Sequence, residues 1–151
     1  MTQPRFTVTR LAGALGAEIA GLDLTQPLRS DDIAALRDAW LLHGVVQLRN
    51  QPLTSEQFLA FAQAIGTPVE YPFVNGITGF PYIIEIKKLE QERANFGGIW
   101  HADTTYLDEP PMGSMLHAQE VPPYGGDTLF ANQYLAYESL SEGMRRFLDC
   151  Q

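Results

Sequence analysis

The chain has 151 residues, 45% of them hydrophobic, with a formal net charge of −8 and a sequence pI near 4.7. This length and composition are sufficient for one sizeable hydrophobic core. The acidic balance disfavours nucleic acid and anionic membrane surfaces as partners, because both attract basic proteins. No apolar run is long enough to span a membrane.

The same features predict a cytoplasmic protein built as one domain. The first five residues lack the apolar core of a secretory signal. The single cysteine, Cys150, excludes an internal disulfide framework and suits a reducing compartment. No repeat, low-complexity tract or linker divides the chain. We therefore expect residues 1–151 to form a single domain.

Hydrophobic patterning predicts strands and helices in the first half. Short strands are expected at residues 6–10, 17–24 and 45–48. Ser30 is the expected N-cap of a helix that runs to about His43. Its predicted buried stripe consists of Ile33, Leu36, Trp40 and Leu41. The capping box Thr54-x-x-Gln57 predicts a second helix that ends near Gly66.

The second half contains more predicted strands than helices. Strands are expected at residues 82–87, 115–120 and 128–131, and a final helix is expected to begin at Ser141. Between them, the polar, glycine-containing residues 89–98 predict a mobile loop. These strands have too few partners to close a barrel or a sandwich, so sheet edges would remain exposed.

His101 and Asp103 are the candidate metal ligands. They are two residues apart in a segment that the sequence predicts to be extended, so their side chains should point to the same face. An imidazole and a carboxylate are two parts of the 2-His-1-carboxylate facial triad, which leaves open positions on a non-haem Fe(II) centre. A polar pair at a strand end is the simpler alternative.

No other residue is an obvious third ligand. His43 lies at a predicted helix end, where a capping or packing role is expected, and His117 lies in a predicted strand as a structural or surface residue. Arg145 and Arg146 fall on the last helix and are expected to face solvent. The sequence therefore supplies an incomplete triad.

Several motifs resemble the TauD/TfdA (taurine dioxygenase) family of Fe(II)- and 2-oxoglutarate-dependent oxygenases. In the second half they are WHADTTY at 100–106, EPP at 109–111, EVP at 120–122, GGDTLF at 125–130 and AYESLS at 136–141. In the first half they are GAEIAGLDL at 16–24, HGVVQLRNQ at 43–51 and FAQAIG at 61–66. The resemblance covers nearly the whole chain, with the motifs in the family's order.

The resemblance implies an α+β fold with a mainly β core, namely a double-stranded β-helix (jelly-roll) with flanking helices. Members of the family are substantially longer than this chain. Their distal histidine ligand and their 2-oxoglutarate-binding arginine lie beyond its last residue. The single TauD/TfdA-like domain is therefore expected to be truncated at its C-terminus and its jelly-roll to be incomplete.

The resemblance also implies a reaction, in which a small organic substrate is hydroxylated and 2-oxoglutarate is decarboxylated to succinate. The implied cofactors are Fe(II), 2-oxoglutarate as co-substrate, and O2. His101 and Asp103 would be the metal ligands, with no catalytic residue beyond them. The hydroxyl of Thr128 would help to bind the far carboxylate of 2-oxoglutarate, although Thr128 also fits an ordinary β-branched strand residue.

The implied substrate is a taurine- or sulfonate-like compound or another small metabolite. Tyr71 occupies the position of the family's substrate-binding histidine, and Asn95 lies near the family's asparagine but out of register with it. Both departures count against taurine itself. Packing by Tyr71 and Phe73 in the core or a lid is an equal alternative, and formation of a homo-oligomer is left open.

Two other classes of function compete with this interpretation. A zinc hydrolase would use His101 and Asp103, but the sequence contains neither a helical zinc motif nor a CxxC pair. The second alternative is a non-catalytic truncated fragment or subunit of a dioxygenase, which would show the same family resemblance. With two ligands and no distal arginine, the 151-residue chain alone is expected to be inactive.

Overall fold

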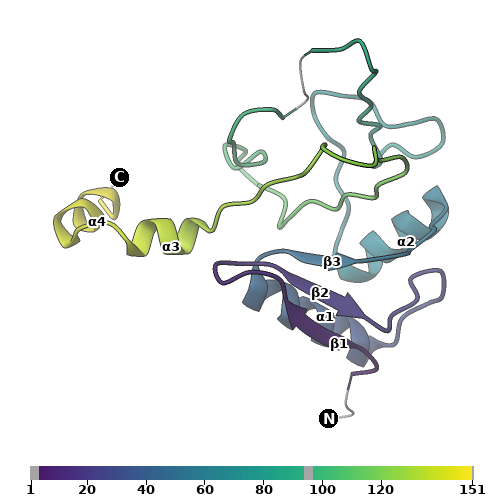
Figure 1. Cartoon of the computed structure of the whole chain (residues 1–151), viewed down its shortest axis with the longest axis horizontal. Helices are drawn as coiled ribbons and strands as arrows, with labels where there is room; N and C mark the ends of the chain where they lie inside the picture. Colours follow the sequence, from purple (N-terminus) through teal and green to yellow (C-terminus); the bar gives the residue numbers. More distant parts are fainter. Residues whose placement is uncertain (1–3, 94–96, 151) are drawn as a thin grey trace. The chain divides into compact units, whose positions relative to one another are not determined.

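The computed structural model describes residues 4–93 and 97–150 (Figure 1). The chain folds into two compact units. One, the sheet unit, contains residues 1–52 and 121–151, and the other, the loop unit, contains residues 53–120. No helix within the described ranges is both long and apolar enough to cross a membrane.

The sheet unit is built on a small mixed sheet. Its strands are β1 (Thr7–Arg10), β2 (Ala17–Ala20) and β3 (Val46–Leu48), in the order β1-β2-β3. β1 and β2 are antiparallel, with Thr7 opposite Ala20, whereas β2 and β3 are parallel, with Ala17 opposite Val46. The three predicted strands are thus confirmed with shorter bounds. Three strands do not by themselves show a double-stranded β-helix.

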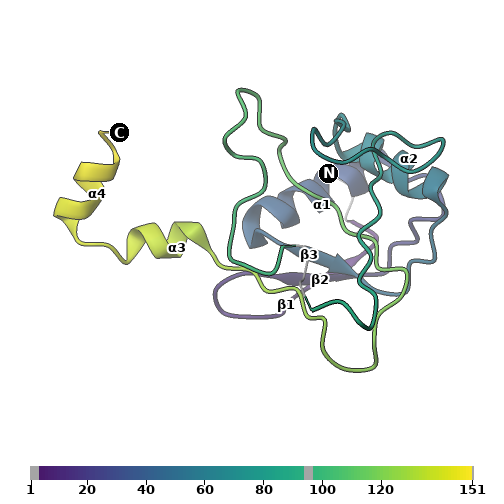
Figure 2. The same ribbon diagram turned by 90° about the horizontal axis from the view of Figure 1, so that it is seen from above.

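Helix α1 (Ser30–His43) links the parallel strands β2 and β3 and packs against the sheet (Figures 1 and 2). A parallel pair needs such a crossover connection. The predicted helix is confirmed, but its N-cap is Arg29, because the extended Arg29 carbonyl accepts the first helical bond, from the amide of Ile33. The helix ends at His43, and the following C-cap residue, Gly44, has a φ of 71° that suits glycine.

The predicted buried stripe of α1 is wrong at Leu41, which is 74% exposed. The buried residues of this helix are Asp32, Leu36 and Ala39. At about 100° per residue, Leu41 lies roughly 140° around the helix from Leu36 and so leaves the buried face. The apolar core of the sheet unit is formed by Phe6, Ala17, Ile19, Leu22, Leu24, Leu36 and Ala39.

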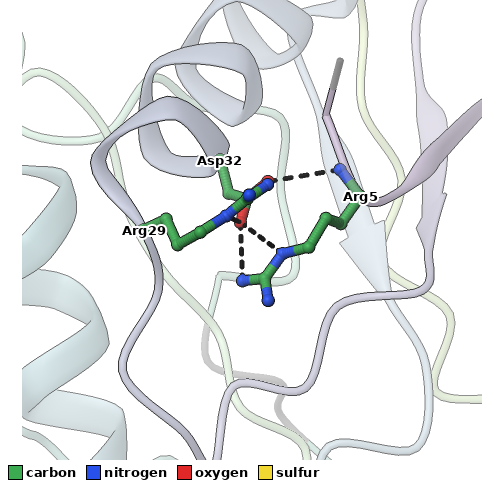
Figure 3. Close-up of polar contacts among 3 residues, drawn as sticks. All are labelled: Arg5, Arg29 and Asp32. Atoms are coloured by element: carbon green, nitrogen blue, oxygen red, sulfur yellow. Dashed lines mark hydrogen bonds and ion pairs between the residues drawn. The ribbon is translucent and has the colours of Figure 1, made fainter. Parts of the chain in front are cut away.

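A buried carboxylate joins the start of α1 to the segment that enters β1. Asp32 is fully buried and accepts hydrogen bonds from both Arg5 and Arg29 (Figure 3). The shortest contacts to its Oδ2 are Arg5 Nη2 at 2.7 Å and Arg29 Nε at 2.9 Å. Hydrogen bonds from Arg29, and then from Arg5, hold the pKa of Asp32 well below its usual range against the opposing effect of desolvation.

The loop unit contains one helix, α2 (Ser55–Ile65), among its described residues. Its predicted capping box is confirmed: the hydroxyl of Thr54 accepts from the Gln57 amide, and the Gln57 side chain accepts from the Thr54 amide. Apart from an isolated bridge between Ile77 and Phe80, the described residues of this unit after α2 form no helix or strand.

The strands predicted at residues 82–87, 115–120 and 128–131 are wrong for this structure. All three ranges are described, and none of them is a strand. A β-strand is stabilised by a ladder to a neighbouring segment, and these segments form no ladder with another segment among the described residues. In the described part of the chain, regular structure is therefore mostly helical, whereas a mainly β core was expected.

Two short helices, α3 (Gln133–Glu138) and α4 (Glu142–Leu148), follow in the sheet unit. The final helix predicted to begin at Ser141 is confirmed within one residue, and the hydroxyl of Ser141 caps it by accepting from the amide of Met144. The sequence analysis did not predict α3. Its N-cap, Asn132, accepts from the Leu135 amide and also donates to the carbonyl of Ala14, in the turn between β1 and β2, at 2.7 Å.

Candidate metal-binding site

The candidate site lies in the loop unit, in a segment without helix or strand. The sequence predicted an extended segment here, and in the structure His101 and Asp103 belong to no strand with a paired neighbour. Their side chains nevertheless lie on the same side, with His101 Nε2 and Asp103 Oδ1 3.1 Å apart. The two side chains are 49% and 58% exposed, so the pair is open to solvent and to small solutes.

The imidazole of His101 is oriented by a backbone carbonyl. Its Nδ1 lies 2.7 Å from the carbonyl oxygen of Ile99. A carbonyl oxygen only accepts, so Nδ1 must hold the proton, and Nε2 is the nitrogen presented to Asp103. This is the arrangement of a metal-binding histidine, whose second ring nitrogen donates to a carbonyl or carboxylate.

The same contacts raise the pKa of His101. The hydrogen bond to the Ile99 carbonyl is the largest cause, and the charge and hydrogen bond of Asp103 act in the same direction, while desolvation opposes them. With Nδ1 protonated, a neutral Nε2 would direct its lone pair at a carboxylate oxygen. The space between Nε2 and Oδ1 therefore favours a positive charge, either a proton or a metal ion.

Gly97 makes room for the imidazole. Its φ is 67°, and a Cβ placed on it would lie 3.1 Å from His101 Cε1. Any side chain at this position would therefore strain the backbone and press on the ring. In the sequence, only a general signal points to this role, namely a pair of glycines in a polar loop.

Asp103 has a hydrogen-bond partner that sequence reasoning missed. Ser114 Oγ donates to Asp103 Oδ2 at 2.8 Å, across eleven residues. Nothing in the pattern of the sequence pairs these two positions, because the residues between them form no regular element.

Thr104, directly after Asp103, was also missed. It has a φ of 46° and is only 7% exposed, and its carbonyl accepts from the amide of Leu107 at 3.1 Å. A β-branched residue in the left-handed region is a conformational outlier, and such outliers concentrate at functional sites. Threonine is common in extended strands, so the residue type at this position predicts an extended backbone and not a left-handed one.

The donor set fits part of an iron site. One imidazole nitrogen and one carboxylate oxygen suit Fe(II) and other first-row metals. Within residues 4–93 and 97–150, no group of three or more His, Cys, Asp or Glu side chains gathers to hold a metal. The part of the chain that is described thus brings together one imidazole and one carboxylate, without a third side chain of these kinds.

The other histidines and the C-terminal arginines have contacts of a different kind. The ring of His117 lies 5.4 Å from that of Phe58, and Gln119 donates to its Nδ1. His43 ends α1, where its carbonyl accepts from the amides of Gly16 and Val45. Arg145 is half-buried, and Arg146 forms an exposed ion pair with Glu142 at 3.6 Å.

Tyr71 lies in the same unit as the histidine–carboxylate pair. It is half-buried and lines a cavity of about 330 Å³. The lining comes from residues 70–71, 74–77 and 79–81 and does not include His101 or Asp103. Its ring contacts that of Phe73 edge-on at 5.5 Å, and Phe73 in turn lies 6.3 Å from Tyr106. This aromatic row therefore extends from Tyr71 to a residue three positions after Asp103.

Thr128 and Asn95 are the other two predicted site residues. Thr128 is exposed, lies outside any strand and belongs to the sheet unit. Asn95 lies outside the described residues. Of the predicted site residues, the structure thus brings together His101 and Asp103.

Comparison of the sequence with known protein families identifies the family of the chain. Residues 7–150 match the family described as "Taurine catabolism dioxygenase TauD, TfdA family". The chain belongs to the TauD/TfdA family. The family resemblance predicted from the WHADTTY and GGDTLF motifs is therefore confirmed.

Two relatives within the family have names that refer to sulfate esters or their cleavage. The chain is 37% identical to an alkylsulfatase of Acinetobacter baylyi, an alignment that covers 96% of this chain and 45% of the relative. It is 34% identical to an alpha-ketoglutarate-dependent sulfate ester dioxygenase of Pseudomonas putida, covering 92% of this chain and 46% of that protein.

The fold agrees with the same family. The crystal structure of a taurine dioxygenase from Burkholderia xenovorans superimposes with a TM-score of 0.82 at 38% identity. The superposition covers 97% of this chain and 51% of the other. The chain thus spans about half the length of the relatives that it matches.

Proposed function

We propose that the complete protein is an Fe(II)- and 2-oxoglutarate-dependent dioxygenase. It would hydroxylate a small organic substrate and convert 2-oxoglutarate to succinate and CO2. The observation that supports this most directly is the approach of His101 Nε2 to Asp103 Oδ1, 3.1 Å apart within the family's WHADTTY segment. For the complete protein we also propose the double-stranded β-helix expected from the sequence.

In this proposal each residue has a limited task. His101 Nε2 and Asp103 Oδ1 bind the metal, and a third ligand comes from outside the described residues. The hydroxyl of Thr128 helps to bind the far carboxylate of 2-oxoglutarate. Bound iron, the keto acid and oxygen supply the oxidation chemistry, while the protein supplies orientation and exclusion of water.

The substrate we propose is a sulfonate or sulfate ester with an apolar body. The names of two relatives, the alkylsulfatase and the sulfate ester dioxygenase, support the sulfur-containing group. The aromatic row of Tyr71, Phe73 and Tyr106 supports the apolar body, because aromatic faces bind hydrocarbon groups by excluding water. Tyr71, with Asn95, is the proposed substrate contact.

The test is release of succinate by the complete polypeptide supplied with Fe(II), 2-oxoglutarate, air and a medium-chain alkyl sulfate. We expect substrate-dependent succinate that His101→Ala abolishes and that His117→Ala retains. Undiminished release from His101→Ala would contradict the assignment.

The alternative, a non-catalytic fragment or subunit, is tested with the 151-residue chain alone. We expect no succinate above the background of metal without protein, because two protein ligands hold iron loosely. Succinate that depends on His101 would contradict this expectation and would mean that a neighbouring copy or another residue supplies the missing ligand.

A further inference from the structure

The two carboxylate oxygens of Asp103 have different partners. Oδ1 faces His101 Nε2 at 3.1 Å, and Oδ2 accepts a hydrogen bond from Ser114 Oγ at 2.8 Å. The carboxylate plane is therefore held at both ends. A rotation that moved Oδ2 toward the imidazole would break the bond to Ser114.

Ser114 fixes Asp103 much as the Ile99 carbonyl fixes His101. The carbonyl of Ile99 occupies Nδ1 and leaves Nε2 for a metal. The hydroxyl of Ser114 occupies Oδ2 and leaves Oδ1 for the same metal. In each side chain one atom is held by a hydrogen bond and the other is free to bind a metal. The two atoms left for the metal, His101 Nε2 and Asp103 Oδ1, face each other. Such outer contacts orient metal ligands, and their loss weakens metal binding.

The geometry points to Ser114 as a positioning residue that keeps Oδ1 of Asp103 turned toward the metal position, an inference that rests on the proposed iron site. Without the Ser114 hydroxyl the carboxylate is free to rotate, and Oδ1 loses its fixed position opposite His101 Nε2. A metal ligand that must first be oriented binds the metal more weakly. By holding Oδ2, Ser114 therefore favours metal binding through Oδ1.

The loop between the two residues explains why position 114 reaches the site. Thr104 turns the chain directly after Asp103, with a φ of 46° and a bond from the Leu107 amide to its carbonyl. Pro110 and Pro111 restrict the return of the loop. Ser114 is exposed and Asp103 is 58% exposed, so their bond should contribute little to global stability. Metal affinity and protein stability can therefore be separated.

The test compares Co(II) binding by the 151-residue chain and its variants, using isothermal titration calorimetry. Co(II) follows Fe(II) closely in the affinity order and does not need oxygen to be excluded. We expect Ser114→Ala to weaken Co(II) binding by about 10–100-fold, as loss of an outer contact to a metal ligand typically does. Ser114→Thr keeps the hydroxyl and should bind within about threefold of the unaltered chain.

The control is Thr78→Ala, which removes an exposed hydroxyl from the same unit. It should leave both the affinity and the melting temperature unchanged, and Ser114→Ala should also leave the melting temperature nearly unchanged. His101-dependent binding that Ser114→Ala does not weaken would overturn the role of Ser114 alone. Absence of His101-dependent binding by the unaltered chain would overturn the metal site and this inference with it.

Discussion

Two aspartates at the centre of polar clusters show how differently this chain uses a carboxylate. Asp32, in the sheet unit, is fully buried and surrounded by the guanidinium groups of Arg5 and Arg29. Asp103, in the loop unit, is 58% exposed and faces one imidazole and one hydroxyl. The first cluster has permanent positive charges within the chain, whereas the second has a partner that can release its proton.

This difference distinguishes a structural carboxylate, Asp32, from the proposed metal ligand, Asp103. Arginine stays charged at any ordinary pH, so nothing else is needed to neutralise Asp32. Histidine loses its proton near neutral pH, and its nitrogen then becomes available to a metal that the carboxylate also attracts. Substitutions in the Asp32 cluster should therefore lower the stability of the protein without changing its metal affinity. Substitutions in the pair His101 and Asp103 should lower metal affinity with little effect on stability.

The largest expected effect is the loss of stability on substituting Asp32. Asp32→Asn removes the charge that balances Arg5 and Arg29 and leaves two guanidinium groups around a neutral amide. Breaking a buried ion pair by removing one partner is strongly destabilising, so we expect the melting temperature to fall by more than about 10 °C. Thermal unfolding followed by circular dichroism measures this.

The matched control is Asp31→Asn, which removes an exposed charge from the neighbouring position of the same helix turn. It should change the melting temperature by no more than about 3 °C, since exposed charges contribute little. Equal effects of the two substitutions would mean that Asp32 is not a structural carboxylate, and the comparison with Asp103 would fail.

A smaller effect on stability is expected when the pH is lowered. The folded-state pKa of Asp32 is lowered, chiefly by Arg29, so the stability it contributes is fully present above its unfolded pKa of about 3.9. This contribution is lost as the pH falls from there toward the folded pKa. The difference in urea midpoint between the unaltered chain and Asp32→Asn should therefore narrow between about pH 5 and about pH 2. A difference that stays constant over this range would contradict the lowered pKa.

The smallest effect is expected from a substitution beside the imidazole of His101. Gly97→Ala places a methyl group 3.1 Å from Cε1 of the His101 imidazole and should weaken Co(II) binding by roughly tenfold. Gly79→Ala is the control, because Gly79 also has a positive φ, of 84°, but a methyl group on it would meet nothing within 4 Å. Both substitutions strain the backbone, and only Gly97→Ala should change affinity. Equal affinities would show that the ring is not held where the structure places it.

Local signals in the sequence predicted much of the framework. The capping box at Thr54 and Gln57 correctly predicted the start of α2, because this motif acts within a single turn of the chain. The strands predicted at residues 82–87 and 115–120 failed because strand pairing depends on a partner elsewhere in the chain.

In the candidate site, too, the contacts between residues close in sequence were predicted and those between distant residues were not. The pair His101 and Asp103 was predicted because two residues of spacing are enough to bring their side chains together. Ser114 and Gly97 were not, since the loop path that brings them to Asp103 and His101 follows no periodic pattern. Likewise, the bond from Asn132 to the Ala14 carbonyl joins positions 118 residues apart.

The central claim is that His101 and Asp103 form one metal-binding pair. The most direct measurement is Co(II) binding to the 151-residue chain by calorimetry, compared with His101→Ala and Asp103→Ala. We predict weak binding at a single site that either substitution abolishes, while His117→Ala, whose ring lies against Phe58, retains it. Binding that is unchanged in His101→Ala or in Asp103→Ala would contradict the claim.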